Sequence, residues 1–433
     1  MSKFIDFYEP AEDSFLLQEQ VKKHANGKVL DMGTGSGIQA LTASSLKEVI
    51  STLAIDINPL ALNHTKAQAK IKHVKLTVKL SNQFENINDQ FDTIICNPPY
   101  LPQDAHIEDP ALYGGIKGHE WSERFITQVS DHLTADGQIL FLFSTLTGKE
   151  KIDELLKLYL LEYELLSTGK IPFETLYIYK ITKSPLRKEI ESHHVHALTY
   201  HAKGKRGIVY KGLYTPAKTK TEIPVAIKIK NPRSEAQNRL SIEAQVLTEI
   251  NKEHIGPKLL FSTPHFLCLE FIDGLFLEEY LTTASYKIAL TLLQDILTQC
   301  YTLDQLQYTK EEMHHPQKHI LITSSNHPPT SSINTPPFTT SRTKRSTKRP
   351  LITAVMIDFE RATKTNKPQN ITQTIEYYTR NKAISTILHL DPQKSRELAQ
   401  IYKKDPSFQN FENIIKTLFT QNPPPIKTSS SKL

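Results

Sequence analysis

The sequence predicts an α/β protein of two domains, a mainly parallel sheet covered by helices and then a small α+β domain of two lobes. Between residues 27 and 179, six short apolar runs alternate with helical stretches, which is typical of strands joined by crossover helices. After residue 195 the pattern changes to neighbouring strands, one helix, another strand and then mostly helix. The length of 433 residues also exceeds what one hydrophobic core usually organises.

The expected elements divide the chain into segments. Strands are expected in the first domain at 28–32, 52–57, 74–79, 91–96, 138–144 and 176–182. In the second domain we expect strands at 200–214, 223–230 and 265–271, and helix at 234–251 and 277–306. The predicted domains are therefore 1–183 and 195–420, joined by a linker at 184–194. Residues 323–350 and 421–433 are rich in Ser, Thr and Pro and are predicted to be disordered.

Composition excludes several classes of function. Hydrophobic residues make up 39% and charged residues 23% of the chain, and no run is long enough to span a bilayer, so we expect a cytoplasmic protein without a membrane partner. The three cysteines have no paired spacing, which argues against a disulfide framework or a zinc site of the chain's own. Five of the six net positive charges lie within 342–349. The near-neutral remainder does not favour a nucleic-acid surface.

A glycine-rich segment lies between the first strand and the helix expected after it. Residues 29–37 read Val-Leu-Asp-Met-Gly-Thr-Gly-Ser-Gly, and the missing Cβ atoms of Gly33 and Gly35 let a cofactor approach the backbone. About twenty residues later, Asp56 ends the second strand. An acid at that edge of the sheet can accept hydrogen bonds from both ribose hydroxyls. The two features together predict a site for a nucleoside cofactor.

Directly after the strand at 91–96 the sequence reads Asn97-Pro98-Pro99-Tyr100. The prolines fix the backbone and donate no hydrogen bonds, so the Asn97 side-chain oxygen and the Pro98 carbonyl can both accept from an NH₂ group. Such a group is a poor nucleophile, and two acceptors can orient it and carry its developing positive charge. Tyr100 would stack on the planar group. The motif therefore predicts transfer to an amide or amino nitrogen.

These motifs together resemble the HemK-like glutamine methyltransferases, in the eukaryotic and archaeal branch that methylates the Gly-Gly-Gln glutamine of class I peptide-chain release factors. The opening Tyr-Glu-Pro-Ala-Glu-Asp-Ser-Phe-Leu-Leu at 8–17 and Gly114, Gly115 and Gly118 also match that branch. The resemblance covers residues 5–180. It implies a class I Rossmann-like methyltransferase fold and S-adenosyl-L-methionine as cofactor.

By the same resemblance, Asp31, Gly33 and Gly35 would line the cofactor and Asp56 would hold its ribose. Asn82 departs from the family, which usually has an aspartate near the adenine amino group, but an asparagine oxygen can still accept that hydrogen bond. The resemblance also implies a release factor as substrate and a small zinc-binding activator protein that covers an apolar sheet edge. The alternative is adenine N6 methylation of nucleic acid, because the same tetrapeptide serves both; otherwise nucleic acid is expected only indirectly, through the ribosome.

The second half has the order of motifs of a nucleotide clamp. A hairpin with Gly204 and Gly207 precedes Val-Ala-Ile-Lys at 225–228, which would place backbone amides and the Lys228 ammonium against phosphates. Glu243 on the next helix can pair with Lys228, and Glu270 lies in the segment 269–272, which is similar to the hinge that binds adenine. The half resembles small atypical kinases related to the RIO and Bud32 groups, which would imply ATP and Mg²⁺.

Departures from the kinase pattern leave its activity open. Asp358, at the end of an apolar strand, is expected to bind magnesium. Ungapped alignment places His314 where kinases have the catalytic aspartate and His319 where they have a metal-binding asparagine. Glu360 replaces the glycine after Asp358-Phe359. This half is therefore either an atypical serine/threonine kinase or ATPase, or a module that only binds nucleotide or a partner, or a kinase-like fold in which these residues are merely structural.

Overall fold

The computed structural model describes residues 8–104, 112–232, 234, 238–324 and 352–419. The chain forms two compact units, Met1–Tyr200 with Lys211–Glu222, and His201–Tyr210 with Ile223–Leu433. The division falls within the hairpin of β8 (Val195–Lys203) and β9 (Gly207–Tyr214). Among the described helices, none combines the length and the apolar character needed to cross a membrane.

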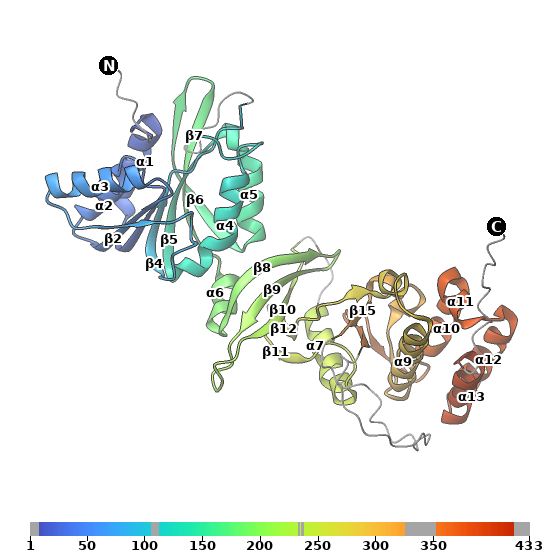
Figure 1. The fold of residues 1–433 in the computed structure, drawn as a ribbon. Helices are drawn as coiled ribbons and strands as arrows, with labels where there is room; N and C mark the ends of the chain where they lie inside the picture. Colours follow the sequence, from blue (N-terminus) through green and yellow to red (C-terminus); the bar gives the residue numbers. More distant parts are fainter. Residues whose placement is uncertain (1–7, 105–111, 233, 235–237, 325–351, 420–433) are drawn as a thin grey trace, which may run out of the picture. The chain divides into compact units, whose positions relative to one another are not determined.

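The first unit is built on a seven-stranded sheet in the order β3-β2-β1-β4-β5-β7-β6 (Figure 1). Strands β1 to β5 pair in parallel, and β7 pairs antiparallel with both β5 and β6. The carboxyl ends of the parallel strands therefore meet at one edge, where ligands bind in sheets of this kind. The strands are β1 (Gly27–Met32), β2 (Val49–Asp56), β3 (Thr77–Leu80), β4 (Phe91–Cys96), β5 (Leu133–Ser144), β6 (Leu161–Ile171) and β7 (Glu174–Lys183).

Helices cover both faces of this sheet, and each face has its own core. Val29 of β1 belongs to a cluster with Leu17 of α1, whereas the next residue, Leu30, belongs to a cluster with Phe125 of α4. Burial on both faces explains why the strands are continuous apolar runs. The helices are α1 (Glu12–His24), α2 (Ile38–Ser44), α3 (Pro59–Ile71), α4 (Glu120–Gln128), α5 (Lys149–Leu158) and α6 (Pro185–Ser192).

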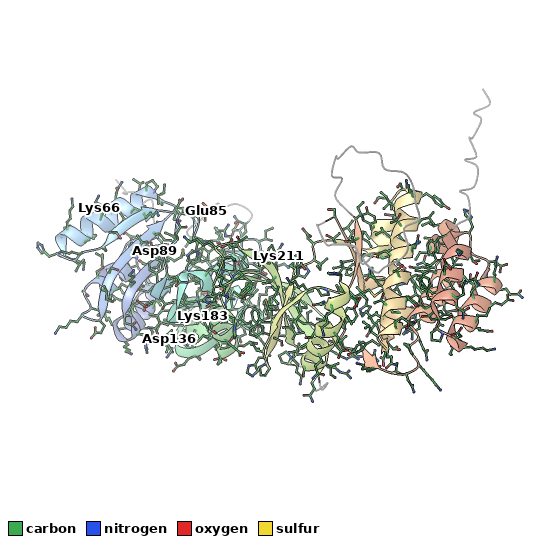
Figure 2. All side chains as sticks on the ribbon, turned by 90° about the horizontal axis from the view of Figure 1, so that it is seen from below. Lys66, Glu85, Asp89, Asp136, Lys183 and Lys211 are labelled. Atoms are coloured by element: carbon green, nitrogen blue, oxygen red, sulfur yellow. The ribbon has the colours of Figure 1, made fainter. Side chains whose placement is uncertain are left out.

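Two features of this unit differ from the sequence expectation. Strand β6 was not predicted, because it is an exposed edge strand whose Leu-Glu-Tyr-Glu start lacks an apolar run. The segment expected as a linker, 184–194, contains helix α6. Arg187 of this helix is 1% exposed and donates to the Tyr159 carbonyl at 3.1 Å, and Glu191 accepts a hydrogen bond at 2.6 Å from Lys183 of β7, which is labelled in Figure 2. These bonds fasten the segment to the first unit.

The second unit combines the greater part of a five-stranded sheet, in which β12 pairs antiparallel with β10 and β11, with a helical part. The sheet has the order β11-β12-β10-β9-β8 and packs against α7 (Arg239–Ile250). Its other strands are β10 (Ile223–Lys230), β11 (Leu259–Ser262) and β12 (Phe266–Glu270). The region expected as one strand at 200–214 is thus a hairpin of two. The helical part contains α8 (Leu277–Leu281), α9 (Tyr286–Gln305), α10 (Asn370–Arg380), α11 (Lys382–Leu388), α12 (Pro392–Lys404) and α13 (Phe408–Phe419).

Short strands connect the helical part to the sheet. They are β13 (Leu275–Phe276), β15 (Ile320–Thr323) and β16 (Thr353–Met356) in one small sheet, and β14 (Tyr308–Thr309) paired with β17 (Thr363–Lys364). The predicted disordered insertion begins inside β15, since Thr323 is its last residue, and its remainder from residue 325 lies outside the described residues. The predicted tail at 421–433 lies outside them as well.

Candidate functional site

The turn after β1 has a shape that suits glycine. Gly33 and Gly35 have φ of +71° and +50°, in the left-handed region that a Cβ atom disfavours. Beneath the turn, Asp31 is 2% exposed and accepts hydrogen bonds from the Thr34 hydroxyl at 2.6 Å and the Ala40 N–H at 3.1 Å. Burial raises the pKa of Asp31 to about 6, although these hydrogen bonds act in the opposite direction. Asp31 therefore holds the turn in place.

Asp56 lies beside this turn. Its Oδ2 accepts a hydrogen bond from the Gly35 N–H at 2.9 Å, and its Oδ1 accepts one from the Asn58 N–H at 2.9 Å. The parallel register of β1 and β2, with Met32 opposite Ile55, brings the two strand ends together. The acid predicted to hold a ribose and the glycine-rich turn thus meet as the sequence predicted, and each carboxylate oxygen keeps a lone pair for a further donor.

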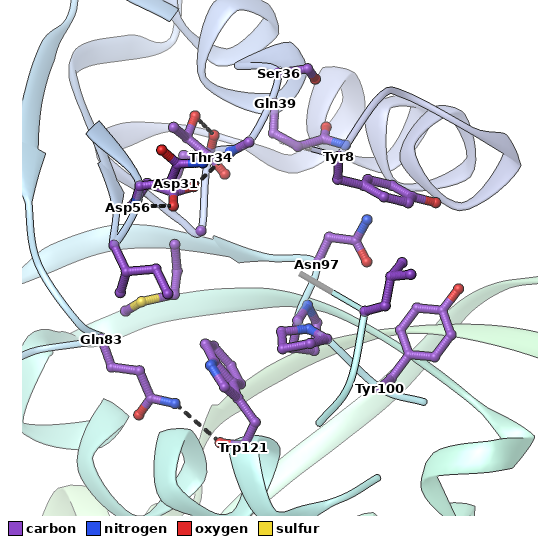
Figure 3. Close-up of a pocket in the computed structure, with 18 of the residues that line it drawn as sticks. Tyr8, Asp31, Thr34, Ser36, Gln39, Asp56, Gln83, Asn97, Tyr100 and Trp121 are labelled. Carbon is purple, nitrogen blue, oxygen red and sulfur yellow. Dashed lines mark hydrogen bonds between the residues drawn. The ribbon is translucent and has the colours of Figure 1, made fainter. Parts of the chain in front are cut away.

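A cavity of about 410 Å³ opens at this edge of the sheet (Figure 3). All the site residues predicted for the first half line it: Asp31, Gly33, Gly35, Asp56, Asn82, Asn97, Pro98 and Tyr100. In Figure 3, Asp31 and Asp56 lie at one end and Asn97 and Tyr100 at the other. One wall therefore suits a nucleoside and the opposite wall suits the group that is modified.

The lining fits S-adenosylmethionine. A Cβ atom built on Gly33 would meet nothing within 4 Å, so the backbone of the turn faces open space that a cofactor can enter. Asn82 donates through Nδ2 to Glu85 Oε1 at 2.9 Å, which leaves the Asn82 oxygen as the atom that can accept from an adenine amino group. The departure from the family's aspartate therefore preserves the acceptor.

Asn97 follows β4 and faces the cavity. Its Nδ2 donates to Asp13 Oδ2 at 2.9 Å. Its Oδ1 is buried and, within the described part of the chain, has no hydrogen-bond partner. Burial, followed by the charge of Asp13, raises the pKa of Tyr100, so this phenol stays neutral. The wall at this end of the cavity thus presents an unpaired acceptor beside a neutral aromatic ring.

The glycines downstream of this tetrapeptide pack against its backbone. A Cβ atom on Gly114 would lie 2.6 Å from the Pro99 carbonyl oxygen, and one on Gly118 would lie 2.7 Å from that of Tyr100. The Gly114 N–H also donates to the Leu101 carbonyl at 2.9 Å. Side chains at these two positions would displace the loop that holds Asn97. Gly114 and Gly118 thus allow the close backbone packing that holds the loop after Asn97 in place.

Sequence reasoning missed several residues that line this cavity, among them Asp13 and Trp121. Asp13 lies in the quoted opening segment, but nothing in its spacing showed that it would reach Asn97. Trp121 is the second residue of α4 and lines the cavity. Its ring stacks on that of Phe125, with ring centroids 5.7 Å apart. Its position one residue after the start of an amphipathic helix gave no signal of its own.

The second unit gathers three acids around one lysine. Lys228 Nζ lies 2.6 Å from Glu243 Oε2, 2.7 Å from Asp358 Oδ1 and 3.4 Å from Glu360 Oε2. Burial lowers the pKa of Lys228, but the three carboxylates outweigh it and raise that pKa overall. Oxygens of the three acids lie within 4.8 Å of one another. The predicted pairing of Lys228 with Glu243 is present, and Glu360 joins it.

The hairpin between β8 and β9 closes over this group. The Gly204 N–H donates to the Gly207 carbonyl at 2.8 Å, and Asn231 Nδ2 donates to the Gly204 carbonyl at 3.0 Å. A Cβ atom on Gly207 would lie 3.2 Å from Lys228 Cε. At the far end, the Glu270 N–H donates to the Lys258 carbonyl at 2.9 Å. The hairpin glycines therefore lie against Lys228 and Asn231, and Glu270 is paired with Val225 of β10, the strand that contains Lys228.

The two predicted histidines differ in their surroundings. His319 Nδ1 lies 3.8 Å from Asp358 Oδ2, and burial, followed by the charge of Lys310, lowers the pKa of His319. His314 is exposed on the 3₁₀ helix η4 (Glu311–His314), and its Nδ1 lies 2.6 Å from the Glu311 carbonyl. The structure thus brings His319 to Asp358, whereas the recorded contacts of His314 are with its own loop and with Arg380.

Lys310 is a further buried residue that the sequence did not reveal. It has 0% exposure, its Nζ donates to the backbone carbonyl of Asp358, and it lies 4.8 Å from the centroid of the Phe359 ring. Burial lowers the pKa of Lys310, while the charges of Glu312 and Asp358 act against that shift. This lysine therefore holds the backbone of the Asp358 segment, whose side chain contacts Lys228.

Family models match both units. One described as methyltransferase small domain matches residues 11–170, and one described as protein tyrosine and serine/threonine kinase matches residues 195–316. The second unit therefore contains a kinase-like domain, and the first a Rossmann-like methyltransferase fold, as the sequence predicted.

Relatives of known name match the first unit. A putative protein N5-glutamine methyltransferase of Methanocaldococcus jannaschii is 36% identical over 178 residues, which are 40% of this chain and 90% of the relative. Methyltransferase HEMK2 of Homo sapiens is 30% identical over 196 residues, 42% of this chain and 92% of the relative. A release factor glutamine methyltransferase of Lactococcus lactis is 34% identical over 122 residues, 26% of this chain and 45% of the relative. The chain therefore belongs to the HemK-like protein N5-glutamine methyltransferases, with a kinase-like domain following the methyltransferase.

Proposed function

We propose that this protein transfers a methyl group from S-adenosylmethionine to the glutamine amide of the Gly-Gly-Gln sequence in a class I peptide-chain release factor. The orientation of Asn97 carries this proposal. Its Oδ1 is buried in the cavity wall without a partner among the described residues, and a buried acceptor left unsatisfied costs about 1–3 kcal/mol. A donor from a bound substrate, such as the NH₂ group of glutamine, would remove that cost.

The geometry suits a nitrogen whose lone pair is delocalised. Asn97 Oδ1 and the Pro98 carbonyl would each accept one hydrogen of the glutamine NH₂ group, which fixes its plane and bears part of the positive charge that develops on nitrogen. No base is needed before the attack. Tyr100, which burial keeps neutral, offers its ring to the planar amide. Bound S-adenosylmethionine supplies the electrophilic methyl group.

Residues at the other end of the cavity would hold the cofactor. Asp56 would accept from the ribose hydroxyls, the Asn82 oxygen from the adenine amino group, and the turn with Gly33 and Gly35 would approach the remainder through its backbone. Asp31 would act by shaping that turn. These roles follow the resemblance and the placement of all five residues along one cavity.

The release factor as substrate is supported by the name of the Lactococcus lactis relative, and we place the reaction in the cytoplasm, where translation ends. Adenine in nucleic acid is the competing substrate. The decisive assay measures methyl transfer from labelled S-adenosylmethionine to a release factor and to its Gln→Ala variant in the Gly-Gly-Gln loop. Loss of label with that substitution supports the proposal, whereas label on nucleic acid instead overturns it.

A matched variant tests the role of the acceptor in the same assay. Asn97→Ala should lower the turnover number to background while leaving the affinity for S-adenosylmethionine within about threefold, because Asn97 contacts the substrate group and not the nucleoside. Glu164→Gln, on the exposed edge strand β6, serves as the control and should match the wild type. Turnover that survives in Asn97→Ala would refute the acceptor role.

A small zinc-binding activator is the further partner that we propose. Strand β3 is one of the two edges of the first sheet, and large apolar side chains are exposed around it, namely Ile57 (54%), Leu60 (47%), Ile71 (68%) and Leu80 (54%). An exposed edge with apolar neighbours is prone to aggregation unless a partner covers it. Co-expression with such an activator should raise the soluble yield, and Ile71→Asp should abolish that gain. An unchanged yield would argue against this surface.

For the second unit we propose nucleotide binding in an atypical kinase domain related to the RIO and Bud32 groups, with ATP and Mg²⁺ as ligands. The buried pair of Lys228 and Glu243, 2.6 Å apart beside Asp358, supports it, because kinases use such a pair to place a lysine against phosphates. Mg-ATP hydrolysis that Asp358→Ala abolishes would support an active enzyme. A rise in melting temperature with Mg-ATP but no hydrolysis would support a binding module. The proposal would be overturned if Mg-ATP were not hydrolysed and did not raise the melting temperature.

A further inference from the structure

Asp13 is held between two sets of donors at the start of α1. Its Oδ1 accepts hydrogen bonds from the Tyr8 hydroxyl at 3.0 Å and from the Ser14 N–H at 2.6 Å and hydroxyl at 3.2 Å. Its Oδ2 accepts from Asn97 Nδ2 at 2.9 Å. The side chain is buried, with 3% exposure of the residue. Every recorded partner of this carboxylate is thus a donor, three on one oxygen and one on the other.

The carboxylate determines which way the Asn97 amide points. An ionised carboxylate only accepts hydrogen bonds, so the amide must turn its NH₂ group toward Asp13 and its oxygen away. The oxygen is then the buried Oδ1 that lacks a partner in the described structure. An amide turned by 180° would present NH₂ to the substrate and would repel a substrate NH₂ group.

We infer that Asp13 is a positioning and specificity-determining residue, which locks Asn97 as an acceptor so that the site selects an NH₂ donor. The inference rests on the proposed transfer to a glutamine amide. Asp13 acts through Asn97, and Tyr8 and Ser14 keep the carboxylate in place. The charge of Asp13 is therefore used to orient a neutral amide, because a neutral side chain in its position would not exclude the reversed orientation.

The substitution Asp13→Asn tests this inference directly, because it preserves the size and shape of the side chain and changes only its charge and hydrogen-bonding groups. The new side chain has one oxygen and one NH₂ group, whereas the site needs two acceptors. Three donors meet at the position of Oδ1, among them the Ser14 N–H at 2.6 Å, so the amide oxygen of Asn takes that position. Its NH₂ group then faces Asn97, which must turn its own oxygen toward it. The substrate would meet NH₂ where the wild type offers an oxygen.

Kinetics and binding form the first arm of the test. Asp13→Asn should lower kcat for the release factor at least about tenfold, the effect of one charge-assisted hydrogen bond, while the Kd for S-adenosylmethionine stays within about threefold, since Asp13 acts at the far end of the cavity. Glu19→Gln, an exposed acid on the same helix paired with Lys22, should leave kcat unchanged.

A spectroscopic arm needs no substrate. In protein labelled with [¹⁵N]asparagine, the side-chain NH₂ signals missing from Asn97→Ala identify Asn97, and in the wild type they should exchange slowly with solvent. Asp13→Asn should shift them and speed their exchange. Unchanged signals or a kcat within about threefold of the wild type would each overturn the inference. If the wild type methylates no glutamine while these signals respond as expected, the proposed substrate fails but the orienting contact stands.

Discussion

Glu360 Oε1 lies 3.2 Å from Nη1 of Arg206, which joins the residue after Asp358-Phe359 to the glycine-containing hairpin 154 positions earlier in the chain. Glu360 is 5% exposed, and its other oxygen is 3.4 Å from Lys228 Nζ. One carboxylate thus lies between two cations that phosphates would approach in a kinase. The glycine that kinases have at this position could not make either contact.

The first prediction concerns this carboxylate. Glu360→Gln should tighten the binding of Mg-ATP by roughly fivefold, close to 1 kcal/mol, because it releases Arg206 and Lys228 from a competing negative charge. Titration calorimetry measures the change. Glu249→Gln removes an exposed acid that pairs with Lys364 at 3.1 Å, and should have no effect. Weaker binding in Glu360→Gln would mean that Glu360 assists the nucleotide.

The second prediction concerns Lys228. Lys228→Met should lower the free energy of unfolding of the second unit by about 3–5 kcal/mol at pH 7.5, because Glu243, which is 1% exposed, loses its cation. Burial already raises the pKa of Glu243, and loss of Lys228 raises it further. The folded variant therefore takes up a proton as the pH falls, and the deficit should shrink at pH 5.5.

Urea unfolding followed by circular dichroism at both pH values measures this deficit. Lys364→Met, which removes an exposed lysine, is the control and should differ from the wild type by less than about 0.5 kcal/mol. A deficit in Lys228→Met that stays constant between the two pH values would contradict the role of Glu243.

The third prediction follows from the buried carboxyl of Asp31. Its pKa is raised by burial from 3.8 to about 6, so the wild type must ionise a buried group that Asp31→Asn lacks. The stability of the wild type relative to Asp31→Asn should therefore be greatest below pH 3.8 and decline as the pH rises through 6, by about 3 kcal/mol at most. Fluorescence of Trp121, the single tryptophan, reports on the first unit. Parallel curves of stability against pH would refute it.

The fourth prediction separates cofactor binding from transfer. Asp56→Ala should weaken the affinity for S-adenosylmethionine by about 1.5–3 kcal/mol, because charge-assisted bonds to the ribose are lost. The Gly35 N–H would also lose its acceptor, now 2.9 Å away. Calorimetric titration checks the value, with Asp136→Ala, an exposed acid paired with Lys188, as the control. An unchanged affinity would show that Asp56 does not hold the cofactor.

Most of the first site could be predicted because its motifs end neighbouring strands. Gly33, Asp56 and Asn97 each follow or end a parallel strand, and parallel strands carry their carboxyl ends to the same edge. Local sequence therefore sufficed to place these residues along one cavity. In the second half, the order of kinase-like motifs found Lys228, which lies within β10, and Asp358, which lies two residues after β16. Sequence reasoning did not find β6, whose exposed residues lack a periodic pattern.

By itself, then, the sequence determined the α/β fold, the family and the residue types on the cavity wall, because apolar periodicity and motif spacing are local properties of the chain. Only the tertiary structure decided how those residues are oriented. Asp13 meets Asn97 across 84 positions, and Glu360 meets Arg206 across 154. Such contacts depend on how α1 and the β8–β9 hairpin pack against segments that are distant in the sequence. Neither the apolar periodicity nor the spacing of the motifs predicts that packing. The acceptor face of Asn97 is a consequence of that packing.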